Sequence, residues 1–290
     1  MILLDYSQVA LSNILAFQKE LKIGSESDIK NLIRHSTLST IKFYKKKYGK
    51  EYGEIVICCD GRRYWRRDVF PNYKAGRKKS REASDLNWNL IFDTLNEIRL
   101  DIQEHFPWKV VHVDRAEADD IIASLTFLTQ EFGHNDKVMI ISSDKDFKQL
   151  HVYENVKQWS PIQKKAVTSK HSEITRQIIE HVVKGDSGDG IPNIMSNDNV
   201  FVNGERQKVD SAKRLQEFFD NGFIACKTDE ERRNWQRNTV LVDFKHIPED
   251  IQNDIQKLYL NNNPKGDKMS VFKYLTDHRC KLLLNEIEEF

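Results

Sequence analysis

The chain has 290 residues, of which 39% are hydrophobic and 31% are charged, a composition typical of a folded protein outside the membrane. No apolar run approaches the roughly 18 residues that a membrane-spanning helix needs, and the N-terminal residues lack the pattern of a secretory signal. We therefore expect a cytoplasmic protein with no membrane partner. The 45 Lys and Arg residues nearly balance the 44 Asp and Glu residues, so the net charge of the whole chain indicates no class of partner.

Four short apolar segments each end at an aspartate, a pattern typical of buried strands. These segments are Ile2–Asp5, Glu54–Asp60, Lys109–Asp114 and Lys137–Asp144. Longer segments with helical periodicity lie between them, at about Ser27–Tyr48, Ser84–Phe106 and Ala116–Phe132. This alternation predicts an α/β fold with a mostly parallel central sheet and helices on both faces.

Helical periodicity dominates after about residue 160. We expect helices at 173–184, 210–219, 230–237, 248–259 and 270–289. The segment Gly185–Asn203 is rich in Gly, Asn, Asp and Ser, so it is predicted to be a loop. The chain is thus expected to divide into an α/β core at residues 1–184 and a smaller helical region at 185–290.

Acidic residues gather where the predicted strands end. In open α/β sheets the ligand site lies at the carboxyl ends of the strands, and Asp5, Asp60 and Asp144 fall there. Further acids occur in EADD at the start of a predicted helix, in SDKD beside Asp144, and in the glycine-rich GDSGDG, where the backbone can turn sharply. The nine candidates are Asp5, Asp60, Glu117, Asp119, Asp120, Asp144, Asp146, Asp186 and Asp189.

Each acid taken alone has a structural explanation, either as a helix-start residue favoured by the helix dipole or as a turn residue. Nine carboxylates at one sheet edge, however, would repel one another unless cations neutralised them. Oxygen ligands suit Mg²⁺ or Mn²⁺ rather than Zn²⁺, and no His or Cys ligand spacing accompanies the acids. The sequence therefore predicts a two-metal site for phosphodiester cleavage, with two Mg²⁺ ions that Mn²⁺ can replace.

A strongly basic segment follows Asp60. Residues 61–81 hold nine Lys or Arg and one Asp, a net charge of +8, so the rest of the chain carries −7. Its basic residues can bind phosphates, and its interleaved aromatic faces can stack on exposed bases for about 1–3 kcal/mol each. Composition alone also fits a solvated, poorly ordered loop. The position beside the predicted metal edge favours a nucleic-acid contact, with Lys74 and Arg77 stabilising charge on the phosphate under attack.

Six motifs spread over residues 1–195 resemble those of the flap endonuclease or 5′ nuclease family, which includes the 5′ nuclease domains of bacterial DNA polymerase I. The motifs are LLDYSQ at 3–8, ICCDG at 57–61, WRRDVFPNYKAGR at 65–77, AEADDIIA at 116–123, ISSDKDFKQL at 141–150 and GDSGDGIPN at 185–193. Within the family, the length and the segments VKQWSP, NGER and LVDFKHIP look most like the ribonuclease H of T-even bacteriophages and their relatives. The resemblance covers nearly the whole chain.

The resemblance implies a PIN-like 5′ nuclease fold and a magnesium-dependent 5′→3′ exonuclease with flap endonuclease activity. Such an enzyme acts on RNA–DNA hybrids and on duplex DNA with 5′ ends or flaps, and it removes RNA primers from lagging-strand fragments in phage replication. A phage-encoded protein of this kind works in the host cytoplasm as a monomer, beside single-strand binding protein and a sliding clamp. Two alternatives stay open: a non-catalytic protein that binds branched nucleic acid, and a metal-dependent phosphatase.

The resemblance also assigns roles to individual residues. The first metal takes Asp5, Asp60, Asp119 and Asp144, partly through water, and the second takes Glu117, Asp120, Asp146, Asp186 and Asp189 as ligands or outer-shell groups. The basic segment, about 62–82, forms an arch that is weakly ordered without substrate over 64–81. Tyr73 stacks there on the terminal base, and the phosphate is contacted by Arg66, Lys74 and Arg77. Further nucleic-acid contacts are expected from Arg62, Arg63, Arg67 and Lys78.

One motif of the family is missing. After GDSGDGIPN the family continues with a glycine-rich turn of the type GIGxKTA, part of a helix-turn-helix element that grips duplex phosphates, whereas Ile194–Phe201 contains no such turn. The resemblance therefore predicts a divergent duplex-binding element. Lys208 and Lys213, together with Arg206 and Arg214, are expected to provide the substitute contacts.

Overall fold

The computed structural model describes residues 1–131, 133–209 and 211–290, with the side chains of residues 79 and 80 outside the description. One sheet runs through the molecule in the order β3-β2-β1-β4-β5-β6. Its first five strands are parallel, and β6 pairs with β5 in the antiparallel direction. The strands are β1 (Ile2–Asp5), β2 (Ile55–Cys59), β3 (Lys109–His112), β4 (Val138–Ile141), β5 (Val156–Ser160) and β6 (Lys165–Val167).

The strands predicted at the four aspartate-ended segments are confirmed: β1 has the predicted bounds, and each of the other three is one to three residues shorter at one or both ends. The strands β5 and β6 were not among the predicted elements. Seven helices precede or join the strands of the parallel sheet: α1 (Tyr6–Ile14), α2 (Gln18–Ile23), α3 (Glu26–Tyr52), α4 (Arg66–Val69), α5 (Gly76–Glu82), α6 (Trp88–His105) and α7 (Ala118–Gln130). Three of these, α3, α6 and α7, match the expected helices, although the expected end of α7 at Phe132 lies outside the described residues.

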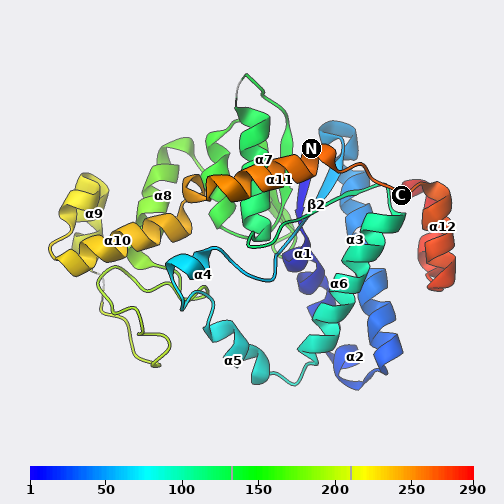
Figure 1. Ribbon diagram of the computed structural model, residues 1–290, viewed down its shortest axis with the longest axis horizontal. Helices are drawn as coiled ribbons and strands as arrows, with labels where there is room; N and C mark the ends of the chain where they lie inside the picture. The colour runs from blue at the N-terminus through cyan, green and yellow to red at the C-terminus, as the bar shows by residue number, and fades with distance from the viewer. Residues whose placement is uncertain (132, 210) are drawn as a thin grey trace.

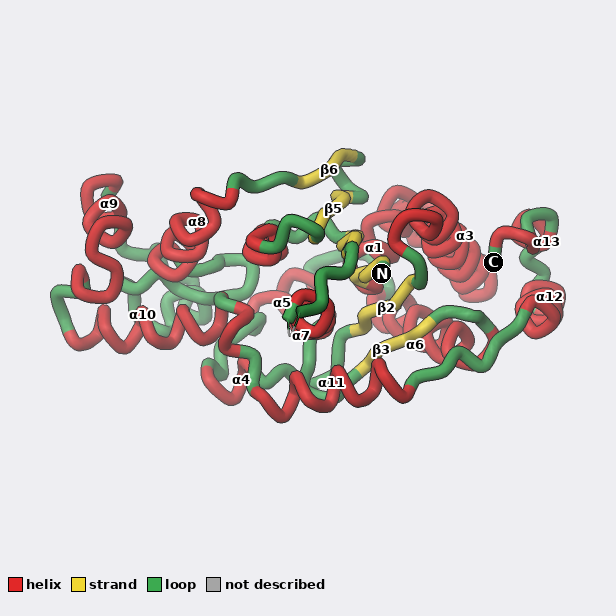
Figure 2. The backbone as a smooth tube through the Cα atoms, turned by 90° about the horizontal axis from the view of Figure 1, so that it is seen from above, coloured by secondary structure: helices red, strands yellow, loops and turns green. Residues whose placement is uncertain are grey.

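Alternation along β1 places apolar side chains in two separate cores. Ile2 and Leu4 belong to a cluster that includes residues of α1, α3 and α6, whereas Leu3 belongs to a second cluster with residues of α7. Helices therefore cover both faces of a mostly parallel sheet, as predicted (Figure 1). Figure 2 shows the strands between these layers, with the C-terminal helices at both ends of the molecule.

The C-terminal part is helical, as expected. Its helices are α8 (His171–Lys184), α9 (Ala212–Asn221), α10 (Asp229–Val242), α11 (Glu249–Asn261), α12 (Lys268–Asp277) and α13 (Lys281–Leu284). The start expected at Asp210 lies outside the described residues, and the single helix expected at 270–289 is replaced by two short ones. Residues of α11 pack into one sheet core and those of α12 and α13 into the other, so this region contributes to both hydrophobic cores.

No helix in the described part of the chain is long and apolar enough to span a bilayer.

The feature of the fold that matters most for the site is its strand order. The chain builds β2 and β3 on one side of β1 and then places β4 on the other side. Such a reversal of strand order creates a crevice at the carboxyl ends of the two strands, which is where α/β proteins bind ligands. Here that crevice lies between Asp5 at the end of β1 and Asp144 after β4.

Candidate metal centre

The two acids at the ends of β1 and β2 are held by hydrogen bonds from neighbouring elements. Asp5 Oδ1 accepts the Gln8 backbone N–H at 3.2 Å, which caps α1, and Oδ2 accepts the Ser142 hydroxyl at 3.0 Å. Asp60 Oδ1 accepts the Ala118 N–H at 3.0 Å. Burial and the nearby charge of Asp60 raise the pKa of Asp5 to about 8, because both effects disfavour its ionised form.

Three more acids stand at the start of α7. Glu117 and Asp120 form a capping box, in which Asp120 Oδ2 accepts the Glu117 N–H at 2.9 Å. Asp119 is partly exposed, and its pKa is raised to about 6 by burial. Asp120 is fully buried, and its carboxylate also contacts Trp65 Nε1 at 3.0 Å and both terminal nitrogens of Arg66. Asp120, Glu117 and Asp119 each offer a carboxylate oxygen within 4.8 Å of the others, so the expected role of Asp120 toward the second metal stays a prediction.

The remaining acids come from the segment after β4 and from the loop after α8. Asp144 Oδ1 accepts the Asp146 N–H at 2.9 Å, and Asp186 Oδ1 accepts the N–H groups of Gly188 at 2.8 Å and Asp189 at 3.2 Å. Gly185, which positions this loop, has φ +67° and lies so close to Ile191 that an added Cβ would be 2.3 Å from the carbonyl oxygen. Only glycine fits there.

His181 was not among the sequence candidates, yet it lies inside the acidic site. Its Nδ1 is 3.3 Å from Asp146 Oδ1, and its Nε2 is 3.1 Å from Asp186 Oδ2. The sequence spacing indicated no histidine ligand, and the structure nevertheless groups His181 with Asp146 and Asp186. A histidine five residues before Asp186, near the end of a predicted helix, is the sequence signal that could have found it.

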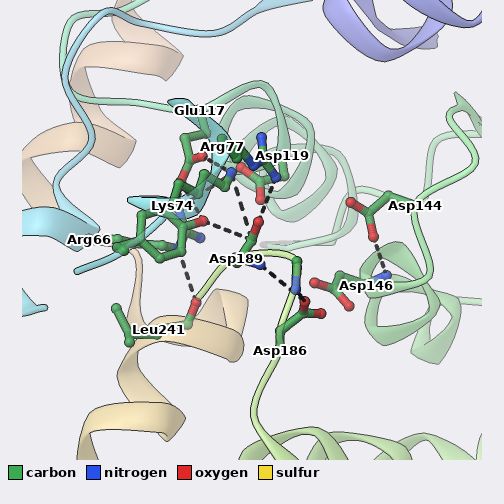
Figure 3. A network of polar contacts seen from close by, with 12 residues as sticks. Arg66, Lys74, Arg77, Glu117, Asp119, Asp144, Asp146, Asp186, Asp189 and Leu241 are labelled. Carbon is green, nitrogen blue, oxygen red and sulfur yellow. Dashed lines mark hydrogen bonds and ion pairs between the residues drawn. The ribbon is translucent and has the colours of Figure 1, made fainter. Parts of the chain in front are cut away.

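All nine predicted acids belong to one connected site at the carboxyl edge of the sheet, where the strand order reverses between β1 and β4 (the switch point). Asp144 raises the pKa of Asp5, Asp119 and Asp146 through its charge, which means that the four carboxylates lie close together. Burial and Asp144 raise the pKa of Asp146 to about 7. In Figure 3, Asp189 lies between basic side chains on one side and Asp146 and Asp186 on the other.

Two basic residues of the arch already contact these acids. Lys74 Nζ pairs with Glu117 Oε1 and lies 3.7 Å from Asp189 Oδ2, and Arg77 Nη2 is 2.5 Å from Asp189 Oδ1. Burial opposes the charged form of Lys74, but Glu117 and Asp189 outweigh it and raise the lysine pKa. The predicted proximity of Lys74 and Arg77 to the metal edge is therefore present in the structure.

Two other arch residues are buried rather than presented to a ligand. Arg66 is 2% exposed, and its guanidinium contacts Glu117 at 2.8 Å, Asp120 at 2.8 Å and the Leu241 carbonyl at 3.0 Å. Tyr73 is also 2% exposed, and its hydroxyl oxygen lies 3.0 Å from Glu117 Oε2 and 3.1 Å from Asp189 Oδ2, so it can donate its one proton to either carboxylate. In this conformation neither can contact a phosphate or stack on a base, contrary to expectation. The arch contains α4, α5 and these two buried residues, and its expected weak order without substrate stays a prediction.

The other predicted nucleic-acid contacts lie on the surface. Arg62, Arg63, Arg67 and Lys78 of the arch are exposed, as are Lys208 and Lys213 near α9. Arg214 does not join them, because it is buried and ion-paired with Glu217 and Glu231, each at 2.7 Å. A cavity of about 1220 Å³ opens beside Asp60, between the arch, α6 and the loop 198–204, and its lining includes Arg62 and Arg77.

The raised carboxylate pKa values predict how stability depends on pH. Asp5 (pKa about 8) and Asp146 (pKa about 7) bind protons more tightly in the folded chain than in the unfolded chain, where an Asp titrates near 4. Their contribution to stability is therefore full below the unfolded pKa and is lost as the pH rises through 7 to 8. In EDTA, the melting temperature is expected to fall between about pH 6.5 and about pH 8.5. Asp5→Asn should flatten this fall, and an identical fall in both proteins would contradict the assignment.

Comparisons with known proteins identify the family. Residues 1–181 match the 5′–3′ exonuclease N-terminal resolvase-like domain, and residues 172–290 match the C-terminal domain of T4 RNase H. Ribonuclease H of Enterobacteria phage T4 is 35% identical over 297 residues, covering 99% of this chain and 95% of that protein. The chain belongs to the 5′–3′ exonuclease family. It is a metal-dependent nuclease of the ribonuclease H and flap endonuclease type, and the resemblance stated above is confirmed.

More distant members of the 5′–3′ exonuclease family share part of the sequence or the fold. Flap endonuclease Xni of Shewanella pealeana is 34% identical over 137 residues, covering 45% of this chain and 48% of that protein. The bacteriophage T5 D15 protein co-crystallised with metal ions has a TM-score of 0.62 at 15% identity, with 89% of this chain and 98% of that chain covered. The T5 D15 flap endonuclease in complex with DNA and metal ions gives a TM-score of 0.61. These likenesses confirm the predicted PIN-like sheet architecture.

Proposed function

We propose that this protein is a Mg²⁺-dependent 5′→3′ exonuclease and flap endonuclease that acts on RNA–DNA hybrids and on duplex DNA with 5′ ends or flaps. Its biological task would be the removal of RNA primers from lagging-strand fragments in phage replication, with single-strand binding protein and a sliding clamp as partners. The observation that carries this proposal is the connected set of carboxylates at the switch point, with Lys74 and Arg77 in direct contact with its edge.

The donor atoms of the site fit two divalent cations. In the proposed shell of the first ion, the charges of Asp60 and Asp144 contribute to the raised pKa of Asp5, and the charge of Asp144 contributes to that of Asp119. A second group of potential ligand atoms includes Asp146 and Asp186. Burial and neighbouring negative charge raise the pKa values of Asp5, Asp119 and Asp146, and a bound cation favours the ionised form of such carboxylates. When bound, two Mg²⁺ ions would activate water and stabilise the leaving oxygen of the cleaved phosphodiester.

Lys74 and Arg77 can change their ion-pair partners when metal ions and the substrate bind. In the absence of substrate, Lys74 and Arg77 neutralise Glu117 and Asp189. Metal ions at the acids would take over that neutralisation, which leaves the ammonium and guanidinium groups to bind the phosphate and stabilise its developing charge. Arg77 is half exposed and lines the large cavity, so a strand entering there meets it beside Asp60.

Cleavage of two 5′-end-labelled substrates tests the proposal directly. An RNA–DNA hybrid and a 5′-flap DNA are incubated with the wild-type protein in Mg²⁺, in Mn²⁺ and in EDTA. We expect short 5′ products in both metals and none in EDTA. If both substrates were bound but neither was cut in any metal, the alternative of a non-catalytic protein for branched nucleic acid would replace this proposal. Hydrolysis of a generic phosphate monoester without strand cleavage would indicate a phosphatase.

The surface lysines near α9 provide a separate test of duplex binding. The double variant Lys208→Glu with Lys213→Glu is expected to bind duplex DNA about tenfold more weakly at low salt, and to lower the slope of log affinity against log salt by about 2. Binding is measured by fluorescence anisotropy in EDTA, so that no cleavage occurs. The matched control, Lys19→Glu with Lys281→Glu, changes two exposed lysines of α2 and α13. Both helices lie away from α9, α2 in Figure 1 and α13 in Figure 2. Equal affinities of the two double variants would remove Lys208 and Lys213 from the interface.

A further inference from the structure

We propose that His181 supplies a nitrogen ligand to the cation held by Asp146 and Asp186, and that this ligand makes the second site bind Mn²⁺ more tightly than Mg²⁺. The inference rests on the proposed two-ion function, and it concerns a residue that the family motifs quoted above do not contain. It assigns a specificity-determining residue to the site.

The first support is the position of the imidazole. His181 lies in the last turn of α8, where its carbonyl accepts the capping Gly185 N–H at 2.8 Å. Its side chain is only 13% exposed, and its two nitrogens lie 3.3 Å from Asp146 Oδ1 and 3.1 Å from Asp186 Oδ2. His181 is therefore mostly buried between two carboxylates of the candidate metal centre. This position suits a ligand of a cation bound there.

The second support is the spacing of the ligand atoms. One atom each from Asp146, His181 and Asp186 can be chosen so that all lie within 4.8 Å of one another. Around a six-coordinate ion with bonds of about 2.1 Å, neighbouring ligand atoms lie about 3 Å apart. The spacing of 3.3 Å from Nδ1 to Asp146 and of 3.1 Å from Nε2 to Asp186 is close to that value, although the two distances involve different ring nitrogens. Small side-chain movements would thus suffice to bring one imidazole nitrogen onto a shared ion.

The third support is a small cavity at the same place. It has a volume of about 10 Å³, and its polar lining includes His181, Asp119, Asp146, Asp186 and Asp189. A space of that size corresponds to about one water-sized probe, which is also the scale of a single small cation. Lys145 pairs with Asp186 at 2.9 Å, but it is well exposed and does not line this cavity, so it leaves the space free.

The preference for Mn²⁺ follows from the chemistry of the nitrogen donor. Mg²⁺ is a hard cation that favours oxygen ligands and retains several waters. Transition-metal ions accept imidazole nitrogen far more readily. The affinities for Mg²⁺ and Mn²⁺ are therefore expected to differ less at an all-carboxylate site than at a site in which His181 replaces one oxygen ligand.

Pulsed electron paramagnetic resonance on Mn²⁺-loaded protein, without substrate, tests this assignment directly. We expect the wild-type spectrum to contain the nitrogen coupling of a coordinated imidazole, and His181→Ala to lose it. A control variant, His171→Ala, removes an exposed histidine from the first turn of the same helix and should keep the coupling. Absence of nitrogen coupling in the wild-type protein would overturn the proposal.

Metal titrations of the same variants test the preference. His181→Ala is expected to weaken one Mn²⁺ site about tenfold or more, with a smaller effect on Mg²⁺, and His181→Gln is expected to retain the fold while losing the preference. Equal losses for the two metals would mean that His181 acts only by positioning the acids, and would contradict its assignment as a ligand. Cleavage by the wild-type protein distinguishes the proposed nuclease function from the proposed role of His181. If cleavage requires a metal but no imidazole is coordinated, the protein is a metal-dependent nuclease and His181 is not a ligand.

Discussion

Replacing Asp144 by Asn is expected to lower the rate of 5′-end cleavage about 1,000-fold while leaving the protein folded. Asp144 is exposed at the carboxyl edge of the sheet, and its charge raises the pKa of three other acids, Asp5, Asp119 and Asp146. This proposed ligand of the first ion therefore also lies near Asp146, a proposed ligand of the second ion. Correct placement of the ions supplies several kcal/mol of transition-state stabilisation, and about 4 kcal/mol corresponds to a factor of about 1,000 in rate.

Single-turnover cleavage of a 5′-labelled flap substrate in Mg²⁺ measures this effect. Asp114→Asn is the matched control, because Asp114 also follows a strand of the sheet but is exposed and pairs with Arg63 at 3.0 Å, outside the acidic site. The hydrogen bond from the Asp146 N–H to Asp144 can be kept by an asparagine oxygen, so the melting temperature of Asp144→Asn should not fall. Near-wild-type cleavage by this folded variant would remove Asp144 from the metal centre.

The core strands could be predicted because their sequences carry a strong local pattern, and β5 could not. Each predicted strand contains adjacent apolar residues that make its pattern clear, whereas β5 has Gln158 at its centre and charged Lys157 beside it. Gln158 is 1% exposed because its amide donates to the carbonyls of Ser142 at 2.9 Å and Asp144 at 2.7 Å. These partners come from the segment that follows another strand, so the burial of a polar residue in β5 depends on tertiary contacts.

The expected helix at 270–289 failed for a related reason. Its sequence has helical periodicity, but α12 ends at Asp277, and Arg279 adopts a left-handed conformation with φ 55°. Such a conformation cannot continue an α-helix. The turn places Cys280 and Leu283 in the same hydrophobic core as Val271. Packing on the sheet, which local propensity does not encode, therefore decides where the helix stops.

The candidate acids could be predicted from topology, whereas the behaviour of the arch could not. Because parallel strands present their carboxyl ends at one edge, acids distant in sequence were expected to converge, and the structure brings them together. Arg66 and Tyr73, by contrast, belong to a segment whose composition favours solvent. Their burial depends on Glu117, on Asp189 and on the Leu241 carbonyl, all of which come from other parts of the chain.

The buried pair of Arg66 with Asp120 leads to the second large expected effect. Replacing Arg66 by Met should lower the free energy of unfolding by about 3–5 kcal/mol, because breaking a buried pair leaves an uncompensated charge in the interior. Here both Asp120 and Glu117 lose a guanidinium partner, and the Leu241 carbonyl loses its donor. Urea denaturation in EDTA measures the change. Arg63→Met is the control, since the exposed pair of Arg63 with Asp114 should be worth at most about 1 kcal/mol.

A double variant separates electrostatics from packing in this effect. Asp120→Asn removes the buried charge but keeps a side-chain oxygen that can accept the Glu117 N–H and the Trp65 N–H. If the cost of Arg66→Met is mainly the unpaired carboxylate, adding Asp120→Asn should restore part of the lost stability, whereas two independent packing defects would add. An additive result would show that Arg66 stabilises α4 through its stem and the Leu241 contact. A restored double variant would show that the arch is anchored to α7 by charge, so that Lys74 and Arg77 are held beside the metal edge through this buried pair.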